Sequence, residues 1–486
     1  MPPVLRTSAL QSADLAGKPP NDAAASNETL ATAPPSPPPS SPPTVSNRRS
    51  HGWCGTCFRA PGLRRRKKLK GEVDAGDDAQ TLAEETVLRR DAERVKEGIL
   101  HEDGQRGLLS ALTKRRRKRP ERIEQPRLLD SLGIARCSWM TALPGSVMLD
   151  ELYIPGSHET LALHYPLLSS LCQTLPLASQ LSFGIRFLDL RFNLTDKGEL
   201  WAYHGLVPQR RRAEEVFEEI YEWLESAEGR GETVIISVKQ ENDTPPEVFA
   251  STLLSLIQST APLPSSPSNR TPASFWYTKN EWPRLGDVRG KAVLFCRFAW
   301  RGYGLHPVSW PNDQHVAWTT DIGGRESLVQ DWYGVRTPLS LPLKASLCLS
   351  LFDAPSSSLL PSSPSSPSPT GPRFPHRISF LSCATFPTLY PSTAAKGWGL
   401  ALRWPWSARR RGGAKLGWKG VNELVLDGLE RLDEREEEKG RGRRREEGQG
   451  GMCVLIDFVE FPPDVREGGE ERRGELVERV IECNFR

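Results

Sequence analysis

Short apolar runs alternate with segments of helical periodicity from Trp139 to the C-terminus. Runs of about four to eight apolar or β-branched residues that stop at Gly, Pro or a charged residue are typical of buried strands. Apolar residues spaced three or four positions apart predict amphipathic helices instead. The predicted strands lie within 147–156, 184–191, 199–204, 233–239, 291–297 and 453–459, and the predicted helices within 213–225, 246–259, 421–432 and 476–483.

A strand followed by a helix, repeated along the chain, implies a parallel sheet covered by helices. Four of the strands are followed by or end at a polar residue: His158, Arg191, Lys239 and Arg297. A (β/α) barrel places its active site at the carboxyl ends of its strands. The pattern therefore predicts an α/β fold whose functional groups gather at one end of the strands.

The rest of the chain does not follow this pattern. Residues 1–130 form a predicted disordered tail, rich in Pro and Ser at 33–43, because such a composition cannot bury a core. The folded domain is predicted to span 139–486, with a Ser/Pro-rich insert at about 354–372 and a charged, Gly-rich insert at about 433–451.

Two basic runs in the tail, 64–70 and 114–119, raise the question of a charged partner. Lipid headgroups are one candidate, since each basic residue near an anionic membrane contributes about 1 kcal/mol. A solvated tail or a nuclear import signal would look the same. Nucleic acid is not expected, because the runs lack interleaved aromatic residues and any known module. Cys54 and Cys57 beside these runs could be acylated, but one such pair is a poor zinc site.

Composition adds limits to this picture. The 486 residues are 37% hydrophobic, include 42 Pro and 40 Gly, and carry a formal net charge of +4, which is too balanced to imply a partner. Nine scattered cysteines suggest a reducing, intracellular setting. The sequence shows no signal peptide and no apolar stretch long enough to span a bilayer. We therefore expect a cytoplasmic protein whose membrane contact is peripheral.

Two of the eight histidines stand where predicted strands end. His158 follows the Pro155-Gly156 turn, and His204 lies beside Gly205 at the end of a short strand. An imidazole near its ordinary pKa can accept or donate a proton at neutral pH. Two such residues make a plausible general base and general acid.

Carboxylates and an arginine are predicted to join them. Asp189 and Arg191 are two positions apart on one strand, so both side chains leave the same face and could form a structural ion pair. Asp457 lies in the apolar run 454–459, where a charge without a partner is costly. A histidine held in one tautomer by Asp457 would satisfy that charge.

Six motifs follow one another in an order that makes a resemblance specific. They are IPGSHET (154–160), GIRFLDLR (184–191), YHG (203–205), SVKQE (237–241), LVQDWY (328–333) and LIDFVEFP (455–462). Together they resemble the bacterial-type phosphatidylinositol-specific phospholipase C X-domain family, over about 139–486 with interruptions. The resemblance implies a distorted TIM-type barrel and an intramolecular phosphoryl transfer that needs no metal or other cofactor. The implied products are diacylglycerol and inositol 1,2-cyclic phosphate.

The resemblance also implies a role for each matching residue. His158 matches the general base, His204 the general acid, and Arg191 the cation that stabilises the phosphate. Asp457 matches the carboxylate that orients a catalytic histidine, and Asp189 the carboxylate near the arginine. Residues matching positions that hold the inositol ring are Lys239, Arg297, Asp331 and Tyr333. Glu159 departs from the pattern, because the family usually has Asp after the histidine.

Several alternatives stay open. A metal-dependent glycerophosphodiester phosphodiesterase would need a cluster of carboxylates around a divalent cation, and Arg191 and Lys239 argue against it. A catalytically impaired lipid-binding barrel would have no need for both proton carriers. Membrane phosphoinositide-type lipid is the expected substrate, but the head group and the oligomeric state are not specified by the sequence. Four tryptophans are candidates for a membrane-inserting rim: Trp398, Trp404, Trp406 and Trp418.

Overall fold

The computed structural model describes residues 127–164, 168–299, 302–353, 375–400, 416–438, 450–462, 464–465 and 471–486. The Pro/Ser-rich and basic segments of the tail, the 354–372 insert, Trp404 and Trp406 lie outside these residues. The folded unit includes residues from Arg127, ahead of the predicted start at Trp139. The side chain of Leu129 is buried in its core, and Arg127 forms an ion pair with Glu478 at 2.6 Å.

One sheet runs through the described part of the chain, and most of its strands are parallel. Its order is β6-β7-β5-β2-β1-β13-β10-β9-β8, with the antiparallel β3 and β4 branching from β2. Only β8 runs antiparallel along the main path, against β9. The strands are β1 (Tyr153–Ser157), β2 (Phe187–Leu194), β3 (Leu200–His204), β4 (Val207–Arg212), β5 (Thr233–Gln240), β6 (Trp276–Tyr277), β7 (Lys291–Arg297), β8 (Trp318–Ile322), β9 (Arg325–Gln330), β10 (His376–Phe380) and β13 (Met452–Ile456).

The sheet closes on itself through a short linking segment, residues 305–308. Leu305 makes a parallel bridge to Phe295 of β7, and Pro307 makes an antiparallel bridge to Ile322 of β8. Each side of this link is an isolated bridge, whereas β1 and β13 pair along a continuous five-residue register. The result is an α/β barrel that is regular on one side and joined by a weak seam on the other.

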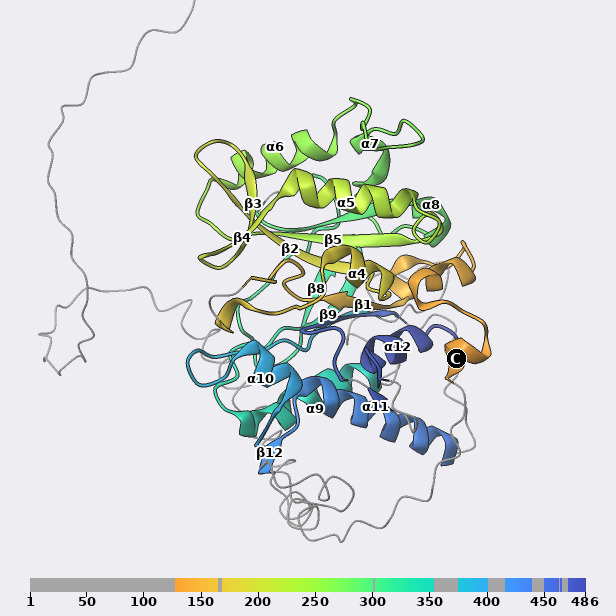
Figure 1. The fold of residues 1–486 in the computed structure, drawn as a ribbon, viewed down its shortest axis with the longest axis vertical. Coiled ribbons are helices and arrows are strands. Elements are labelled where there is room, and N and C mark those ends of the chain that lie inside the picture. The colour runs from red at the N-terminus through yellow and green to blue at the C-terminus, as the bar shows by residue number, and fades with distance from the viewer. Residues whose placement is uncertain are drawn as a thin grey trace, which may run out of the picture. The chain divides into compact units, whose positions relative to one another are not determined.

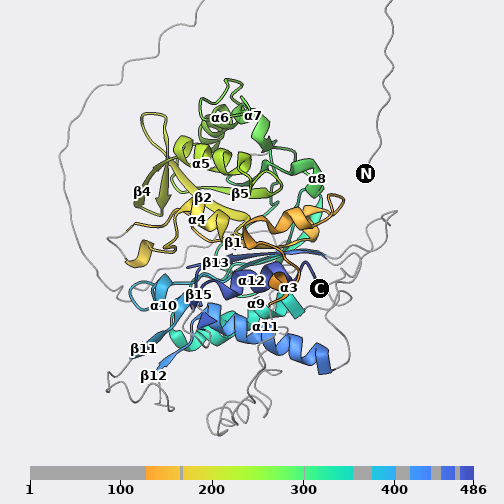
Figure 2. The same ribbon diagram turned by 45° about the vertical axis from the view of Figure 1, so that its right-hand side comes forward.

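Helices cover the strands on two sides (Figures 1 and 2). The helices α5 (Ala213–Glu225), α6 (Pro246–Ile257), α7 (Pro272–Phe275) and α8 (Leu285–Val288) lie together on one side. The helices α9 (Leu341–Asp353), α10 (Pro391–Lys396), α11 (Val421–Glu438) and α12 (Glu475–Glu482) lie on the other. The remaining short elements are α3 (Leu128–Ser131), η1 (Arg136–Ala142), η2 (Leu149–Glu151), η3 (Leu168–Ser170), α4 (Leu177–Ser182), η4 (Pro338–Ser340), β11 (Trp398–Leu400), β12 (Leu416–Trp418), β14 (Asp464–Val465) and β15 (Glu471–Arg472).

Helix α5 shows how local sequence produces this layering. Val216, Ile220 and Leu224 repeat at helical spacing and are fully buried against the sheet. Glu214 and Glu215 occupy the first turn, where negative charge is favourable to the helix dipole. The predicted helix 213–225 and the predicted strand 291–297 coincide with α5 and β7.

Several boundaries differ from the sequence prediction. The run 147–156 is a strand only from Tyr153, because Leu149–Glu151 forms a 3-10 turn. Strand β13 ends at Ile456, so Asp457 follows the strand instead of lying inside it. The predicted charged loop 433–451 was wrong at its start, since α11 continues to Glu438. Asp433, in this part of α11, forms an ion pair with Arg486 at 2.7 Å, which helps to hold this turn of the helix in place.

No helix in the described part of the chain is long and apolar enough to cross a bilayer.

Candidate active site

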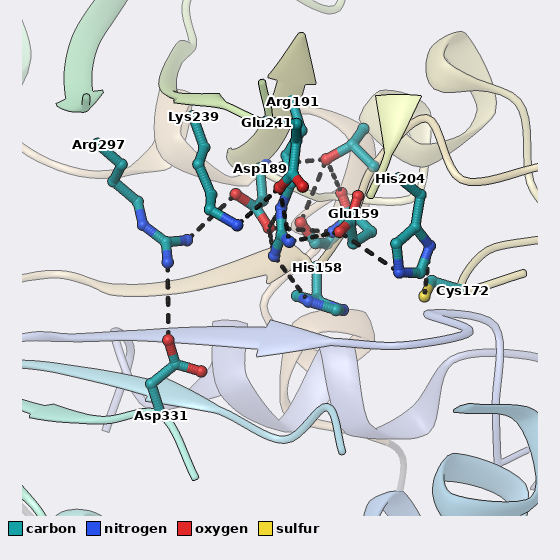
Figure 3. A network of polar contacts seen from close by, with 12 residues as sticks. His158, Glu159, Cys172, Asp189, Arg191, His204, Lys239, Glu241, Arg297 and Asp331 are labelled. Atoms are coloured by element: carbon teal, nitrogen blue, oxygen red, sulfur yellow. Dashed lines mark hydrogen bonds and ion pairs between the residues drawn. The ribbon is translucent and has the colours of Figure 1, made fainter. Parts of the chain in front are cut away.

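The carboxyl ends of neighbouring parallel strands bring the predicted site residues together (Figure 3). His158 follows β1, and Asp457 follows its neighbour β13. Arg191 of β2 pairs with Lys239 near the end of β5, and Lys239 pairs with Arg297, the last residue of β7. Because parallel strands end at the same rim, residues far apart in sequence share one site.

His158 is held from both ring nitrogens. Its Nδ1 lies 2.8 Å from Asp457 Oδ1, and its Nε2 lies 3.0 Å from a guanidinium nitrogen of Arg191. A guanidinium can only donate, so Nε2 must accept, and the ring proton of the neutral imidazole is on Nδ1. This tautomer leaves a lone pair on Nε2, which accepts the hydrogen bond from Arg191.

The same contacts set the proton affinity of His158. Burial alone would lower its pKa, but the charge and hydrogen bond of Asp457 outweigh burial and the nearby Arg191. The net result is a pKa above the ordinary value of 6.5. His158 is therefore a stronger base than a free imidazole.

Arg191 is surrounded by carboxylates. Its guanidinium lies 2.5 Å from Glu159, 2.9 Å from Asp189 and 3.2 Å from Glu241. Burial would lower the pKa of Arg191, but these three carboxylates raise it well above its usual value. Burial would likewise raise the pKa of Asp189, yet Arg191 and Arg297 hold it well below the usual range. The group is a dense, ionised network at the centre of the site.

Glu159 links this network to the second histidine. Its carboxylate lies 3.7 Å from Nε2 of His204 and is almost completely buried. Its backbone has a φ of 45°, an uncommon conformation for a residue with a side chain. Its backbone N–H donates to Asp189 at 3.2 Å, which helps to hold that conformation.

His204 comes from a different structural setting. It is the last residue of β3, in the β3–β4 hairpin that branches from the barrel path. Its Nδ1 lies 3.2 Å from the carbonyl oxygen of Ser170, which can only accept, so Nδ1 carries a proton. The sulfur of Cys172 lies 3.9 Å from the same nitrogen. The side chain of His204 is 23% exposed, against 14% for His158.

The predicted ring-binding residues line the other end of the network (Figure 3). Arg297 lies 3.3 Å from Asp189 and 3.6 Å from Asp331. Lys239 forms an ion pair with Glu241 at 2.6 Å. Tyr333 lies farther out, being 40% exposed, with its hydroxyl donating to Asn312 at 2.6 Å.

Four residues of the site have no role in the sequence prediction. Glu241 had a usable signal, because it lies two positions beyond Lys239 on an extended segment. Trp310 packs its ring under Arg297 at 4.3 Å and donates to Asp331 at 3.1 Å. Ser170 and Cys172 come from an irregular segment after β1, where no periodic pattern marks which side chains point inward.

Comparison with known families agrees with the motif order. Residues 146–298 match the family model described as phosphatidylinositol-specific phospholipase C, X domain. The match agrees with the resemblance that the sequence predicts for this part of the chain. The match covers β1 to β7 and contains His158, Arg191 and His204.

Curated relatives share the region. The chain is 32% identical over 162 residues to the 1-phosphatidylinositol phosphodiesterase of Listeria monocytogenes, covering 32% of this chain and 47% of that protein. It is 26% identical over 215 residues to the enzyme of the same name from Staphylococcus aureus, covering 42% of this chain and 66% of that protein. The matched region thus spans from about half to just under two thirds of these relatives.

Two solved structures were also matched. A phosphatidylinositol-specific phospholipase C from Staphylococcus aureus is 17% identical, with a TM-score of 0.48, over 72% of this chain and 97% of that one. The Listeria monocytogenes enzyme is 19% identical, with a TM-score of 0.43, over 72% of this chain and 99% of that one.

Proposed function

We propose that this protein is a phosphodiesterase that cleaves phosphatidylinositol-type lipids between glycerol and phosphate. In the proposed reaction the inositol 2-hydroxyl attacks phosphorus, and the bond from phosphorus to the glycerol oxygen breaks. His158 takes the hydroxyl proton on Nε2, and His204 gives a proton to the departing oxygen. The products are diacylglycerol and inositol 1,2-cyclic phosphate.

The observation that carries this proposal is the pair of contacts on His158. A base needs a lone pair aimed into the site and a pKa suited to neutral pH. The hydrogen bond from Nδ1 to Asp457 leaves the lone pair on Nε2 and raises the pKa. The guanidinium of Arg191 lies 3.0 Å from Nε2 of His158. It could therefore bind a non-bridging phosphate oxygen while the neighbouring 2-hydroxyl donates its proton to Nε2.

His204 is suited to the acid role. Nδ1 is already occupied by the Ser170 carbonyl, so Nε2 is the nitrogen that can hold a second proton and hand it on. The carboxylate of Glu159 lies 3.7 Å from this Nε2. The two histidines are joined by the network around Arg191, so a base and an acid serve one phosphorus centre.

The surroundings of Arg191 favour this function over a metal-dependent phosphodiesterase. A hard divalent cation such as Mg²⁺ or Ca²⁺ would need oxygen ligands, which Glu159, Asp189 and Glu241 would have to supply. The guanidinium lies within 3.2 Å of all three carboxylates and neutralises them itself. Arg191 thus supplies, as part of the chain, the positive charge that a metal ion would otherwise bring.

Membrane contact is the second part of the proposal. Trp398 of β11 and Trp418 of β12 stack at 5.3 Å and are 42% and 37% exposed. Indole rings at a surface suit the interface between lipid and water. We place this pair at the membrane contact through which the enzyme reaches its lipid. The basic runs of the tail are a further proposed contact with anionic lipid.

The test uses the full chain, phosphatidylinositol vesicles and excess chelator, with phosphorus NMR to follow the product. Inositol 1,2-cyclic phosphate should form with the unmodified protein and be lost in His158→Ala and His204→Ala. Activity that appears only when a divalent cation is restored would indicate the metal-dependent alternative. Vesicle binding without any turnover would indicate an impaired barrel.

A further inference from the structure

We propose that the site also holds an inhibitory soft metal ion, such as Zn²⁺, bound by Cys172, His158 and Asp457. The inhibition rests on the proposed function, whereas the metal binding itself does not. This site is separate from the carboxylate cluster around Arg191, and its occupant would block the reaction instead of supporting it.

The ligand atoms are already gathered. The ligand atoms of His158, Cys172 and Asp457 all lie within 4.8 Å of one another. The side chains of Cys172 and Asp457 are almost completely buried, so their positions are fixed by packing. In tetrahedral zinc sites bonds of about 2.0 to 2.3 Å put ligand atoms roughly 3.5 Å apart. Movements of about 1 Å would therefore bring all three ligands onto one ion.

His204 can supply a fourth ligand only if its Nδ1 releases the proton that it donates to Ser170. Nδ1 of His204 lies 3.9 Å from the sulfur of Cys172. Sulfur, imidazole and carboxylate form a donor set that suits Zn²⁺ and related ions, and not Mg²⁺ or Ca²⁺. Water could complete the coordination if His204 keeps its hydrogen bond to Ser170.

The segment that carries Cys172 is anchored rigidly. Its backbone N–H donates to the Ala162 carbonyl at 3.0 Å, and its carbonyl accepts from the Phe458 N–H at 2.8 Å. These bonds tie the loop after β1 to the loop after β13, the same two loops that carry His158 and Asp457. The thiol is thus held beside the histidine by the frame that positions the base.

Metal binding here has a defined proton balance. The thiol of Cys172 releases its proton to solvent when its sulfur binds the ion. The metal replaces the proton between His158 Nδ1 and Asp457, and that proton moves to Nε2. Arg191 then loses its hydrogen bond to Nε2 but keeps its three carboxylates.

The consequence for the base follows directly. With a proton on Nε2 and the metal on Nδ1, His158 has no lone pair for the 2-hydroxyl. Soft divalent ions should therefore inhibit turnover, and a chelator should restore it. Hard ions such as Mg²⁺ should have no such effect.

The first test measures binding without any reliance on turnover. Co²⁺ gives a thiolate-to-metal charge-transfer absorption when bound through cysteine sulfur. Because Cys54 and Cys57 form a second thiol pair in the sequence, titrations are made in full-length protein carrying Cys54→Ser and Cys57→Ser. We expect one Co²⁺ per chain with this absorption, loss of the absorption in Cys172→Ser, and no loss in Cys383→Ser, another buried cysteine.

The second test measures inhibition by Zn²⁺ on the same variants, with melting curves as a check on folding. Cys172→Ser should need at least tenfold more Zn²⁺ for half-inhibition, and Cys383→Ser should behave as the parent. Absence of the Co²⁺ absorption in the parent, or its persistence in Cys172→Ser, would overturn the metal site. If Co²⁺ binds through Cys172 but no variant turns over lipid, the proposed function fails and the metal site stands.

Discussion

The two histidines of the site sit in contrasting surroundings. His158 directly follows β1, which pairs with β13 along a continuous parallel register. Both of its ring nitrogens have a partner within 3.0 Å. His204 stands at the end of a hairpin outside the barrel path, with looser contacts of 3.2 and 3.7 Å. A base that must meet a hydroxyl in one orientation benefits from the rigid position. An acid that must follow a departing oxygen tolerates the looser one.

The largest effect should separate the two roles by leaving group. On phosphatidylinositol, His158→Ala and His204→Ala should each lower kcat by about 10²- to 10⁴-fold, the usual value of a general acid or base. On a soluble 4-nitrophenyl inositol phosphate, whose leaving group needs no proton, His204→Ala should lose less than about tenfold while His158→Ala loses as much as before. Steady-state rates on both substrates decide this. Equal losses for both variants on the aryl ester would contradict the assignment.

Asp457→Asn should give the next largest effect, on the order of 10²-fold in kcat/KM, because it removes the group that fixes the tautomer. The proposed base works when neutral, so activity rises with pH through the pKa of His158, which lies above 6.5 in the intact site. Without Asp457 burial dominates, the pKa falls, and the acid limb of the pH profile shifts to lower pH. Asp331→Asn is the control, and it should leave that limb in place.

Glu159→Asp should have a moderate effect and would link the two histidines. The glutamate reaches Arg191 at 2.5 Å and His204 at 3.7 Å, and a side chain one methylene shorter cannot serve both at these distances. We expect roughly a threefold to tenfold loss of kcat on the lipid and a smaller loss on the aryl ester. Glu241 contacts Arg191 but not His204. The variant Glu241→Asp should therefore lose the same factor of kcat on both substrates.

The smallest effect on chemistry should come from the exposed tryptophans. Trp398→Ala with Trp418→Ala should reduce vesicle binding and vesicle turnover by about tenfold, because an interfacial contact is lost. Turnover of the soluble aryl ester should not change. Leu132→Ala, which removes an exposed apolar side chain ahead of the barrel strands, should affect neither. A loss on the soluble substrate would show that the pair supports the fold instead.

The contrast between the histidines also explains what could be predicted from sequence. Site residues at strand ends, such as His158, Arg191 and Lys239, are predictable from sequence. The apolar runs locate the ends of the strands, and parallel strands bring those ends together. The apolar run around Asp457 predicts that this carboxylate pairs with a histidine, without indicating which one, and the structure places it 2.8 Å from Nδ1 of His158. The length of α11 was mispredicted, because charged residues such as Asp433 fit a solvated loop as well as an exposed helix face.

Other parts depended on contacts that have no local signature. Cys172 and Ser170, which lie in an irregular loop, contact His204, the proposed acid. Trp310 lies in a long connection between β7 and β8 and contacts Arg297. Closure of the barrel is also not predictable from the sequence, because residues 305–308 contribute isolated bridges and no periodic strand. Such features depend on tertiary packing, which periodicity does not encode.

That closure has a consequence for how the molecule responds to heat. Opening of a protein begins where few hydrogen bonds must break. The link at 305–308 is held by two backbone bonds to β7, one from Val308 to Asp321 and one from the His306 N–H to the Asn280 side chain. Amide hydrogen exchange should therefore be fastest at this link and slowest between β1 and β13. Trp310 follows the link and contacts both Arg297 and Asp331. Warming should thus displace the proposed ring-binding residues Arg297 and Asp331, raising KM, well before it disturbs the bond between His158 and Asp457.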